Sequence, residues 1–200
     1  MRELIPAISI AGFAATAASA GITLDEGTFG DFSDDRFNPT RAVLASGTNR
    51  ISGRFGISPT PDVHDLDYVT FRVEAGWELT SFRVASASVG GAFAFVAIQS
   101  GPIVTIPADW TSINSPLLGW AHFGTASVGS DLLEDMRNSP GSVGFTGPLG
   151  AGEYALWIME LDTSEAHSYA FDVEVSAVPA PGAVTAIAAW AACGRRRRRA

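Results

Sequence analysis

The stretch Ser168-Tyr-Ala-Phe-Asp-Val-Glu-Val175 alternates large apolar residues with small or charged ones. A period of two places successive side chains on opposite faces of an extended strand. The residues expected to face a core are Tyr169, Phe171, Val173 and Val175, and those expected to face solvent are Ala170, Asp172 and Glu174. The pattern predicts a half-buried β-strand of the kind found in antiparallel sheets.

The same alternation appears in Asp65-Leu-Asp-Tyr-Val-Thr-Phe-Arg-Val73. One face carries Val69, Phe71 and Val73, and the other carries Tyr68, Thr70 and Arg72. Further strands are expected in residues 21–40 with a turn-rich loop, in 41–57 as a pair joined at Ser46-Gly47, and in 77–85 with a bulge between Leu79 and Phe82. Others are expected in 93–99, around 103–106, and in 119–123 and 153–161.

A single helix is expected in residues 131–137, with Ser130 as its N-cap and acidic residues in its first turn. Many short strands, frequent glycine turns and one short helix predict an all-β fold, an antiparallel β-sandwich or jelly roll. Residues 21–177 are enough for one domain with one core.

Composition restricts what this domain binds. Residues 21–177 carry seven Arg and twenty Asp or Glu residues, a formal charge of −13, and the chain has no lysine. Such a charge argues against binding to nucleic acid or to an anionic membrane. The single cysteine, Cys193, lies beyond this region, so an internal disulfide and a catalytic thiol are both excluded within it.

Residues 1–20 have the pattern of a secretory signal peptide. Arg2 precedes an apolar run in residues 4–17, and Ala18-Ser19-Ala20 fits the small-x-small rule for cleavage after Ala20 by signal peptidase. The alternative is a buried N-terminal helix, which Pro6 and the many small residues disfavour.

Residues 178–200 form a three-part tail. The motif Val178-Pro179-Ala180-Pro181 is followed by an uncharged run in residues 182–194, about 20 Å long if helical. That length is short of a hydrocarbon core of about 30 Å. The cluster that ends the tail is Arg195, Arg196, Arg197, Arg198 and Arg199. Positive residues stay on the cytoplasmic side, so residues 21–177 are expected outside a transient inner-membrane anchor. A basic tail that binds nucleic acid or anionic lipid is the alternative.

The tail resembles the PEP-CTERM sorting signal of Gram-negative bacteria, in which a Val-Pro-Glu-Pro motif, a hydrophobic helix and an arginine cluster are read by a membrane exosortase. Ala180 replaces the usual glutamate, and the apolar segment is shorter than usual. Residues 25–35, 44–53, 65–76 and 149–158 are similar to the β-sandwich of exported PEP-CTERM proteins and of bacterial pre-peptidase C-terminal domains. The resemblance implies an exosortase-sorted accessory or matrix domain without catalytic machinery, and some related sandwiches bind calcium or polymers.

Acidic residues suggest one binding site. Asp62, His64, Asp65 and Asp67 crowd a loop and the start of a strand, and the loop with Asp31 and Asp34 has more carboxylates. Carboxylate oxygens are the ligands that Ca²⁺ prefers. The calcium ligands predicted from the sequence are Asp31, Asp34, Asp65 and Asp67. The spacing fits no EF-hand, and a solvated acidic turn is the alternative.

The sequence suggests two other chemistries. The three histidines, His64, His122 and His167, suggest a hydrolase, but neither a Gly-x-Ser-x-Gly elbow nor a His-Glu-x-x-His pair accompanies them. Trp110 and Trp120 lie in less regular segments and form a candidate platform for extracellular polysaccharide, whereas Trp77 and Trp157 are expected in the core.

The sequence therefore predicts an exported protein of the envelope surface or extracellular matrix, processed by signal peptidase and an exosortase-type enzyme. Its sandwich is expected to be structural or binding rather than enzymatic. The alternatives are a carbohydrate-binding module and an envelope hydrolase.

Overall fold

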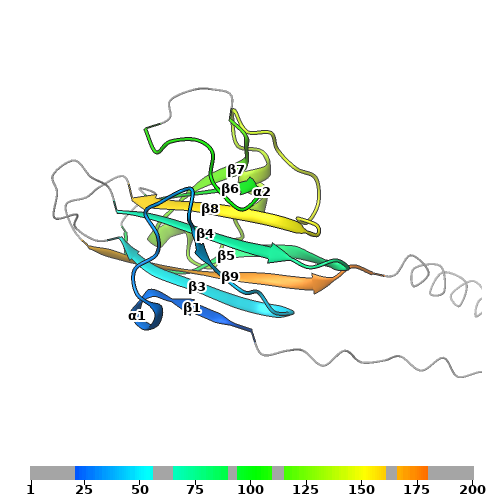
Figure 1. Ribbon diagram of the computed structural model, residues 1–200, viewed down its shortest axis with the longest axis horizontal. Helices are drawn as coiled ribbons and strands as arrows, with labels where there is room; N and C mark the ends of the chain where they lie inside the picture. The colour runs from blue at the N-terminus through cyan, green and yellow to red at the C-terminus, as the bar shows by residue number, and fades with distance from the viewer. Residues whose placement is uncertain (1–20, 56–64, 90–93, 110–114, 161–165, 180–200) are drawn as a thin grey trace, which may run out of the picture.

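A computed structural model of the chain describes residues 21–55, 65–89, 94–109, 115–160 and 166–179 (Figure 1). Two β-sheets pack face to face, with strand orders β1-β3-β9-β5 and β2-β4-β8-β6-β7. The first sheet comprises β1 (Thr23–Asp25), β3 (Gly47–Phe55), β9 (His167–Ala177) and β5 (Trp77–Ala87). The second comprises β2 (Thr40–Arg41), β4 (Leu66–Val73), β8 (Gly152–Glu160), β6 (Ala94–Ser100) and β7 (Leu117–Phe123). The predicted all-β sandwich is confirmed.

The inner face of β9 supplies the centre of the core, as its alternation predicts. Tyr169, Phe171 and Val173 are almost fully buried, and the Phe171 ring packs 4.7 Å from Phe82 and 4.9 Å from Phe123, between ring centroids. Ala170 has the predicted outward parity, but the expectation that it faces solvent is wrong. It is only 6% exposed, and it lies in an inner strand, between β3 and β5.

The outer face of the five-stranded sheet is also partly buried. Tyr68 lies on the face opposite Val69, as predicted, yet both are buried. Tyr68 stacks on Trp157 with ring centroids 6.4 Å apart, in a second cluster that includes Val104 and Ile106. Residues 103–106 form no strand; their backbone bends while two side chains cover this face.

The sheets are mixed rather than wholly antiparallel as predicted. β1 runs parallel to β3, and β2 runs parallel to β4, whereas the other pairs are antiparallel. Both parallel strands belong to the N-terminal segment, which reaches its partners through long connections. A hairpin imposes an antiparallel direction, and neither strand is joined to its partner by one. The predicted strand pair in residues 41–57 is reduced to the short β2 and to β3.

The two edges of the sandwich are closed by different segments. At one edge, residues 26–39 cross from β1 to β2 and include α1 (Glu26–Phe29); the Tyr68 amide donates to the Ser33 carbonyl oxygen at 2.9 Å. At the other edge, α2 (Leu133–Arg137) follows η1 (Thr125–Ser127) and buries Leu133 and Met136. The described residues thus hold three short helical segments rather than the one predicted.

The start of α2 corrects the predicted cap. Leu132, not Ser130, is the N-cap residue, and its side chain makes no capping hydrogen bond. The Asp131 carboxylate accepts a hydrogen bond from the Leu133 amide at 3.1 Å instead. Asp131 therefore meets the need for an acceptor at the helix start.

Two further expectations are decided by the described residues. The register of β5 against β9 shifts between Leu79 and Ser81, which confirms the predicted bulge. The predicted signal segment, with Ala18 and Ala20, and most of the sorting tail, from Ala180 on, lie outside the described residues. Among the described residues, no helix is long and apolar enough to cross a membrane.

Candidate functional site

Asp67 points into the sandwich. It has the same parity in β4 as Val69 and Phe71, so its side chain lies between the sheets, and the residue is 0% exposed. Its Oδ2 accepts a hydrogen bond from the Tyr169 hydroxyl at 2.8 Å. Its Oδ1 is buried and has no hydrogen-bond partner among the described residues. A buried carboxylate with one donor is far from satisfied.

Glu26 approaches Asp67 from the N-terminal segment. Its Oε1 accepts a hydrogen bond from the Phe32 amide at 3.0 Å, and its Oε2 accepts one from the Arg54 amide at 2.6 Å. Arg54 belongs to β3, so this carboxylate fastens the crossing segment to the four-stranded sheet.

Glu26, Asp31 and Asp67 form a cluster of carboxylates, which we call the edge cluster. One oxygen of each lies within 4.8 Å of the others. Asp67 is buried, Glu26 is half-buried and Asp31 is exposed. The cluster therefore reaches from the core to the surface, with its open side at Asp31.

Ionising all three carboxyl groups of the edge cluster at once is unfavourable. Burial, and after it the neighbouring Glu26 charge, raises the pKa of Asp67 to about 9. Burial also raises the pKa of Glu26, against the lowering effect of its two backbone hydrogen bonds. Like charges this close favour either a bound proton or a bound cation.

A glycine makes room for the cluster. Gly53 pairs with Tyr169 across β3 and β9, and a Cβ at this position would lie 2.5 Å from the Tyr169 hydroxyl oxygen and 2.9 Å from Cδ of Glu26. Any other residue at position 53 would displace the groups that hold the cluster together.

The structure brings together some of the predicted calcium ligands. Asp31 and Asp67 meet in the edge cluster, whereas Asp34 accepts a hydrogen bond from the Leu66 amide at 2.9 Å through its Oδ1. Asp65 lies close enough for its charge to raise the pKa of Asp67 slightly. Sequence reasoning missed Glu26, for which the sequence has no signal. The inward parity of Asp67 with Val69 was a signal for its burial.

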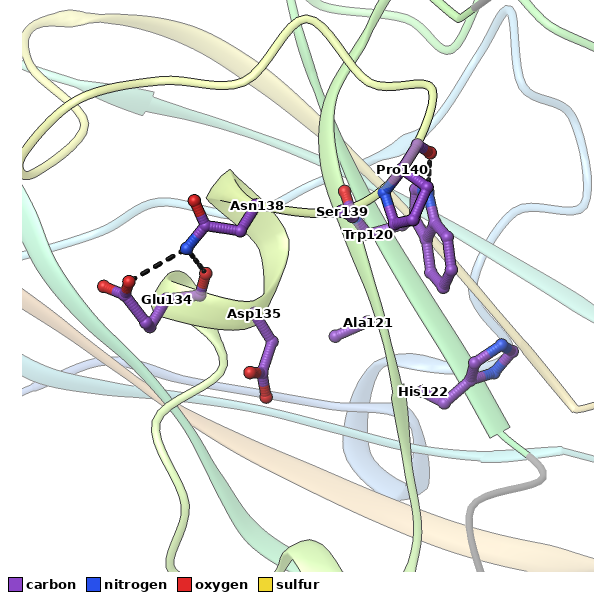
Figure 2. A pocket seen from close by; sticks show the side chains of 8 residues that line it. All are labelled: Trp120, Ala121, His122, Glu134, Asp135, Asn138, Ser139 and Pro140. Atoms are coloured by element: carbon purple, nitrogen blue, oxygen red, sulfur yellow. Dashed lines mark hydrogen bonds between the residues drawn. The ribbon is translucent and has the colours of Figure 1, made fainter. Parts of the chain in front are cut away.

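A second site is a groove beside β7 (Figure 2). It has a volume of about 330 Å³ and is lined by Trp120, Ala121, His122, Glu134, Asp135, Asn138, Ser139 and Pro140. Trp120 and His122 extend from one face of β7. On the opposite wall, α2 supplies the acidic groups and its C-cap residue Asn138 supplies the amide.

Hydrogen bonds fix the walls of this groove. Trp120 Nε1 donates to the Pro140 carbonyl oxygen at 3.1 Å, and the Trp120 amide donates to Ser139 Oγ at 3.0 Å. Asn138 Nδ2 donates to the Glu134 backbone oxygen and to its carboxylate, as the dashed lines in Figure 2 show. The indole ring is thereby held half-buried beside polar groups. Of the predicted aromatic pair, Trp110 lies outside the described residues.

The other two tryptophans are placed near apolar clusters as expected. Trp157 is 3% exposed, although it lies on the outer face of the five-stranded sheet, and Trp77 packs against the main core.

The histidines occupy separate places. His122 packs edge-on against Trp120, with ring centroids 5.3 Å apart, and His64 lies outside the described residues. His167 Nε2 lies 3.3 Å from the buried Glu160 Oε1, and its Nδ1 lies 3.4 Å from Ser88 Oγ. Ser88 Oγ also accepts a hydrogen bond from the Ser168 amide at 2.8 Å, which ties this hydroxyl to the backbone of β9.

These features define the class of protein: an all-β sandwich of two mixed sheets with a carboxylate cluster at one edge and an aromatic groove at the other. Comparisons with protein families, with curated proteins and with solved structures find no match to this chain.

Proposed function

We propose that this chain is an exported, non-enzymatic structural or binding protein of a bacterial cell envelope or extracellular matrix. Residues 1–20 direct export, and residues 178–200 hold the chain at the inner membrane until an exosortase-type enzyme releases it. The cofactor, if any, is a divalent cation, and nucleic acid is not a partner of so acidic a domain.

The observation that supports the proposal is the position at which the N-terminal and C-terminal segments join the sandwich. β1 is parallel to β3 and β9 is antiparallel to it, so β1 begins at the end of the sandwich where β9 finishes (Figure 1). The two predicted targeting segments therefore join the sandwich at one end. The opposite end, with α1 and the edge cluster, is left to face away from a membrane.

The test is the intact mass of the protein from the membrane, envelope and medium fractions of its native cells. We expect the loss of residues 1–20 and of the residues that follow the Val178–Pro181 motif. A control with residues 195–199 all changed to Ala is expected to lose only the signal peptide. An uncleaved tail in the wild-type protein from every fraction would contradict exosortase processing.

The groove in Figure 2 favours carbohydrate binding as a second candidate. An aromatic face stacks on the apolar face of a sugar ring, and carboxylate and amide groups hydrogen-bond its hydroxyls. Trp120 is beside Glu134 and Asn138 in this arrangement. We expect retention on neutral polysaccharide columns that Trp120→Ala abolishes. Trp77→Phe, at a partly buried site outside the groove, serves as the control; equal retention of both variants would exclude the groove.

The hydrolase alternative is tested at the contact between Ser88 and His167. Because Ser88 Oγ already accepts a backbone hydrogen bond, we expect Ser88→Ala and His167→Gln to leave unchanged any hydrolytic activity found with ester and glycoside substrates. Loss of an activity in both variants would instead establish an enzyme.

A further inference from the structure

The deepest part of the edge cluster is a buried oxygen without a donor. Tyr169 donates to Oδ2 of Asp67, and Oδ1 has no hydrogen-bond partner among the described residues. A carboxylate removed from water requires more than one favourable partner. The group that completes Asp67 is therefore either a proton shared with Glu26 or a cation held by both.

The composition of the cluster favours a cation. Three carboxylates, on the α1 segment, on the loop that follows and on β4, place one oxygen each within 4.8 Å of the others. A shared proton would join two of the carboxylates, whereas a divalent cation attracts all three. The ligands are oxygen atoms without nitrogen or sulfur, the set that Ca²⁺ prefers.

The exposure of the cluster on one side also fits calcium. Ca²⁺ takes about six to eight oxygen ligands in flexible geometry, and water commonly fills some positions. Asp31 is exposed, so water reaches the cluster from its side. Because Gly53 has no side chain, Tyr169 and Glu26 keep their positions in the cluster.

We propose that Glu26, Asp31 and Asp67 bind Ca²⁺ at the edge of the sandwich and thereby join its two sheets. Glu26 is hydrogen-bonded to the Arg54 amide of β3, and Asp67 belongs to β4, so a shared ion links one sheet to the other. Compared with the ligands predicted from the sequence, this site keeps Asp31 and Asp67, omits Asp34 and Asp65, and adds Glu26. The inference does not rest on the proposed function, because it concerns only the folded sandwich.

The test compares two aspartates of the same loop in the full chain. Protein freed of metal with EDTA is titrated with CaCl₂ by calorimetry, and Tb³⁺ luminescence sensitised by aromatic residues is the second readout. We expect a dissociation constant on the order of 10⁻³ M or tighter, the range of extracellular calcium modules. We expect Asp31→Asn to weaken binding by about tenfold or more, as loss of a charged ligand should.

Asp34→Asn is the matched control, because Asp34 contacts the Leu66 amide; we expect its affinity to stay within about threefold of wild type. Asp67→Asn should abolish the terbium signal, and since Asp31 is exposed, Asp31→Asn keeps the test valid if Asp67→Asn does not fold. No binding at 10 mM CaCl₂ would overturn the proposal and leave a shared proton in the cluster. Equal weakening by Asp31→Asn and Asp34→Asn would overturn it as well, because it would mean a diffuse acidic surface.

Discussion

At the edge formed by β5 and β7, α2 fills the gap between the sheets with Leu132, Leu133 and Met136, all nearly inaccessible to solvent. At the edge formed by β1 and β2, the N-terminal segment brings Glu26 against the buried Asp67. Each edge also contains an aspartate that is partly or fully buried. Comparing Asp67 with Asp131 therefore shows how the surroundings change the pKa of the same carboxyl group.

The two aspartates differ in how many donors reach them. Burial alone raises the pKa of Asp131, but hydrogen bonds from Ser81, Leu133 and Phe82 outweigh it and the net pKa is lowered. Burial and the negative charge of Glu26 together raise the pKa of Asp67 to about 9, and the hydrogen bond from the Tyr169 hydroxyl does not offset them. Hydrogen-bond donors of the protein satisfy the Asp131 carboxylate at the α2 edge. The Asp67 carboxylate at the opposite edge needs a proton or a cation as well.

The largest expected effect comes from filling the space behind the edge cluster. Gly53→Ala puts a methyl group 2.5 Å from the Tyr169 hydroxyl oxygen, and Tyr169 is 1% exposed and cannot move freely. We expect the free energy of unfolding to fall by about 3 kcal/mol, the upper range for overpacking. Urea denaturation measures it. Gly150→Ala is the control, because a Cβ there meets nothing within 4 Å; equal effects of the two would contradict the role of Gly53.

The sequence predicts the regions that depend on local patterns better than those that depend on contacts between distant residues. The alternation in β4 and β9 predicts the sandwich and its inner face, because period two is local. The carboxylate of Glu26 meets Asp67 only after residues 26–39 cross the edge, and no local pattern encodes that crossing. The parallel direction of β1 and β2 was missed for the same reason.

The groove shows the same limit. Trp120 was predicted as a platform residue from its irregular surroundings, but its partners Ser139 and Pro140, which follow α2, meet it through tertiary packing. Gly119 lies so close to α2 that a Cβ would reach the Met136 carbonyl oxygen. A glycine in a strand is a signal for close backbone approach, although it does not identify which segment approaches.

The second expected effect is a pH dependence at the edge cluster in the absence of calcium. Asp67 faces Glu26, Tyr169 and the charge of Asp65. Its folded pKa lies above its unfolded value, so its contribution is fully present below pH 4 and is lost as pH rises toward about 9. In EDTA we expect wild type to lose about 2 kcal/mol relative to Asp67→Asn between pH 5 and 6.5, at about 1.4 kcal/mol per pH unit. Parallel stability curves for the two proteins would contradict the raised pKa.

The third expected effect is a pH dependence of stability at the α2 edge, opposite in sign to that of Asp67. Asp131→Ala removes the acceptor for the Phe82 and Leu133 amides, each 3.1 Å from its Oδ1. We expect a loss of about 1–2 kcal/mol at pH 7, the cost of unpaired donors near the surface. Because the pKa of Asp131 is lowered, its contribution is present above the unfolded value near 4 and is lost as pH falls through the folded value. Thermal melts of wild type and Asp131→Ala should therefore converge in acid, and a constant difference down to pH 2 would refute this origin.

The smallest expected effect completes the comparison with a carboxylate that keeps part of its contact with water and is paired with a cation. Asp172 receives two hydrogen bonds from Arg50, at 2.8 and 2.9 Å, across β3 and β9, and the two side chains are 49% and 26% exposed for Arg50 and Asp172. Solvent screens such a pair, so Arg50→Gln should cost about 0.5 kcal/mol and less at high salt. Urea denaturation at 20 mM and 500 mM NaCl measures both. A cost as large as that of Asp131→Ala would mean that solvent screening does not reduce what a paired surface carboxylate contributes to this sandwich.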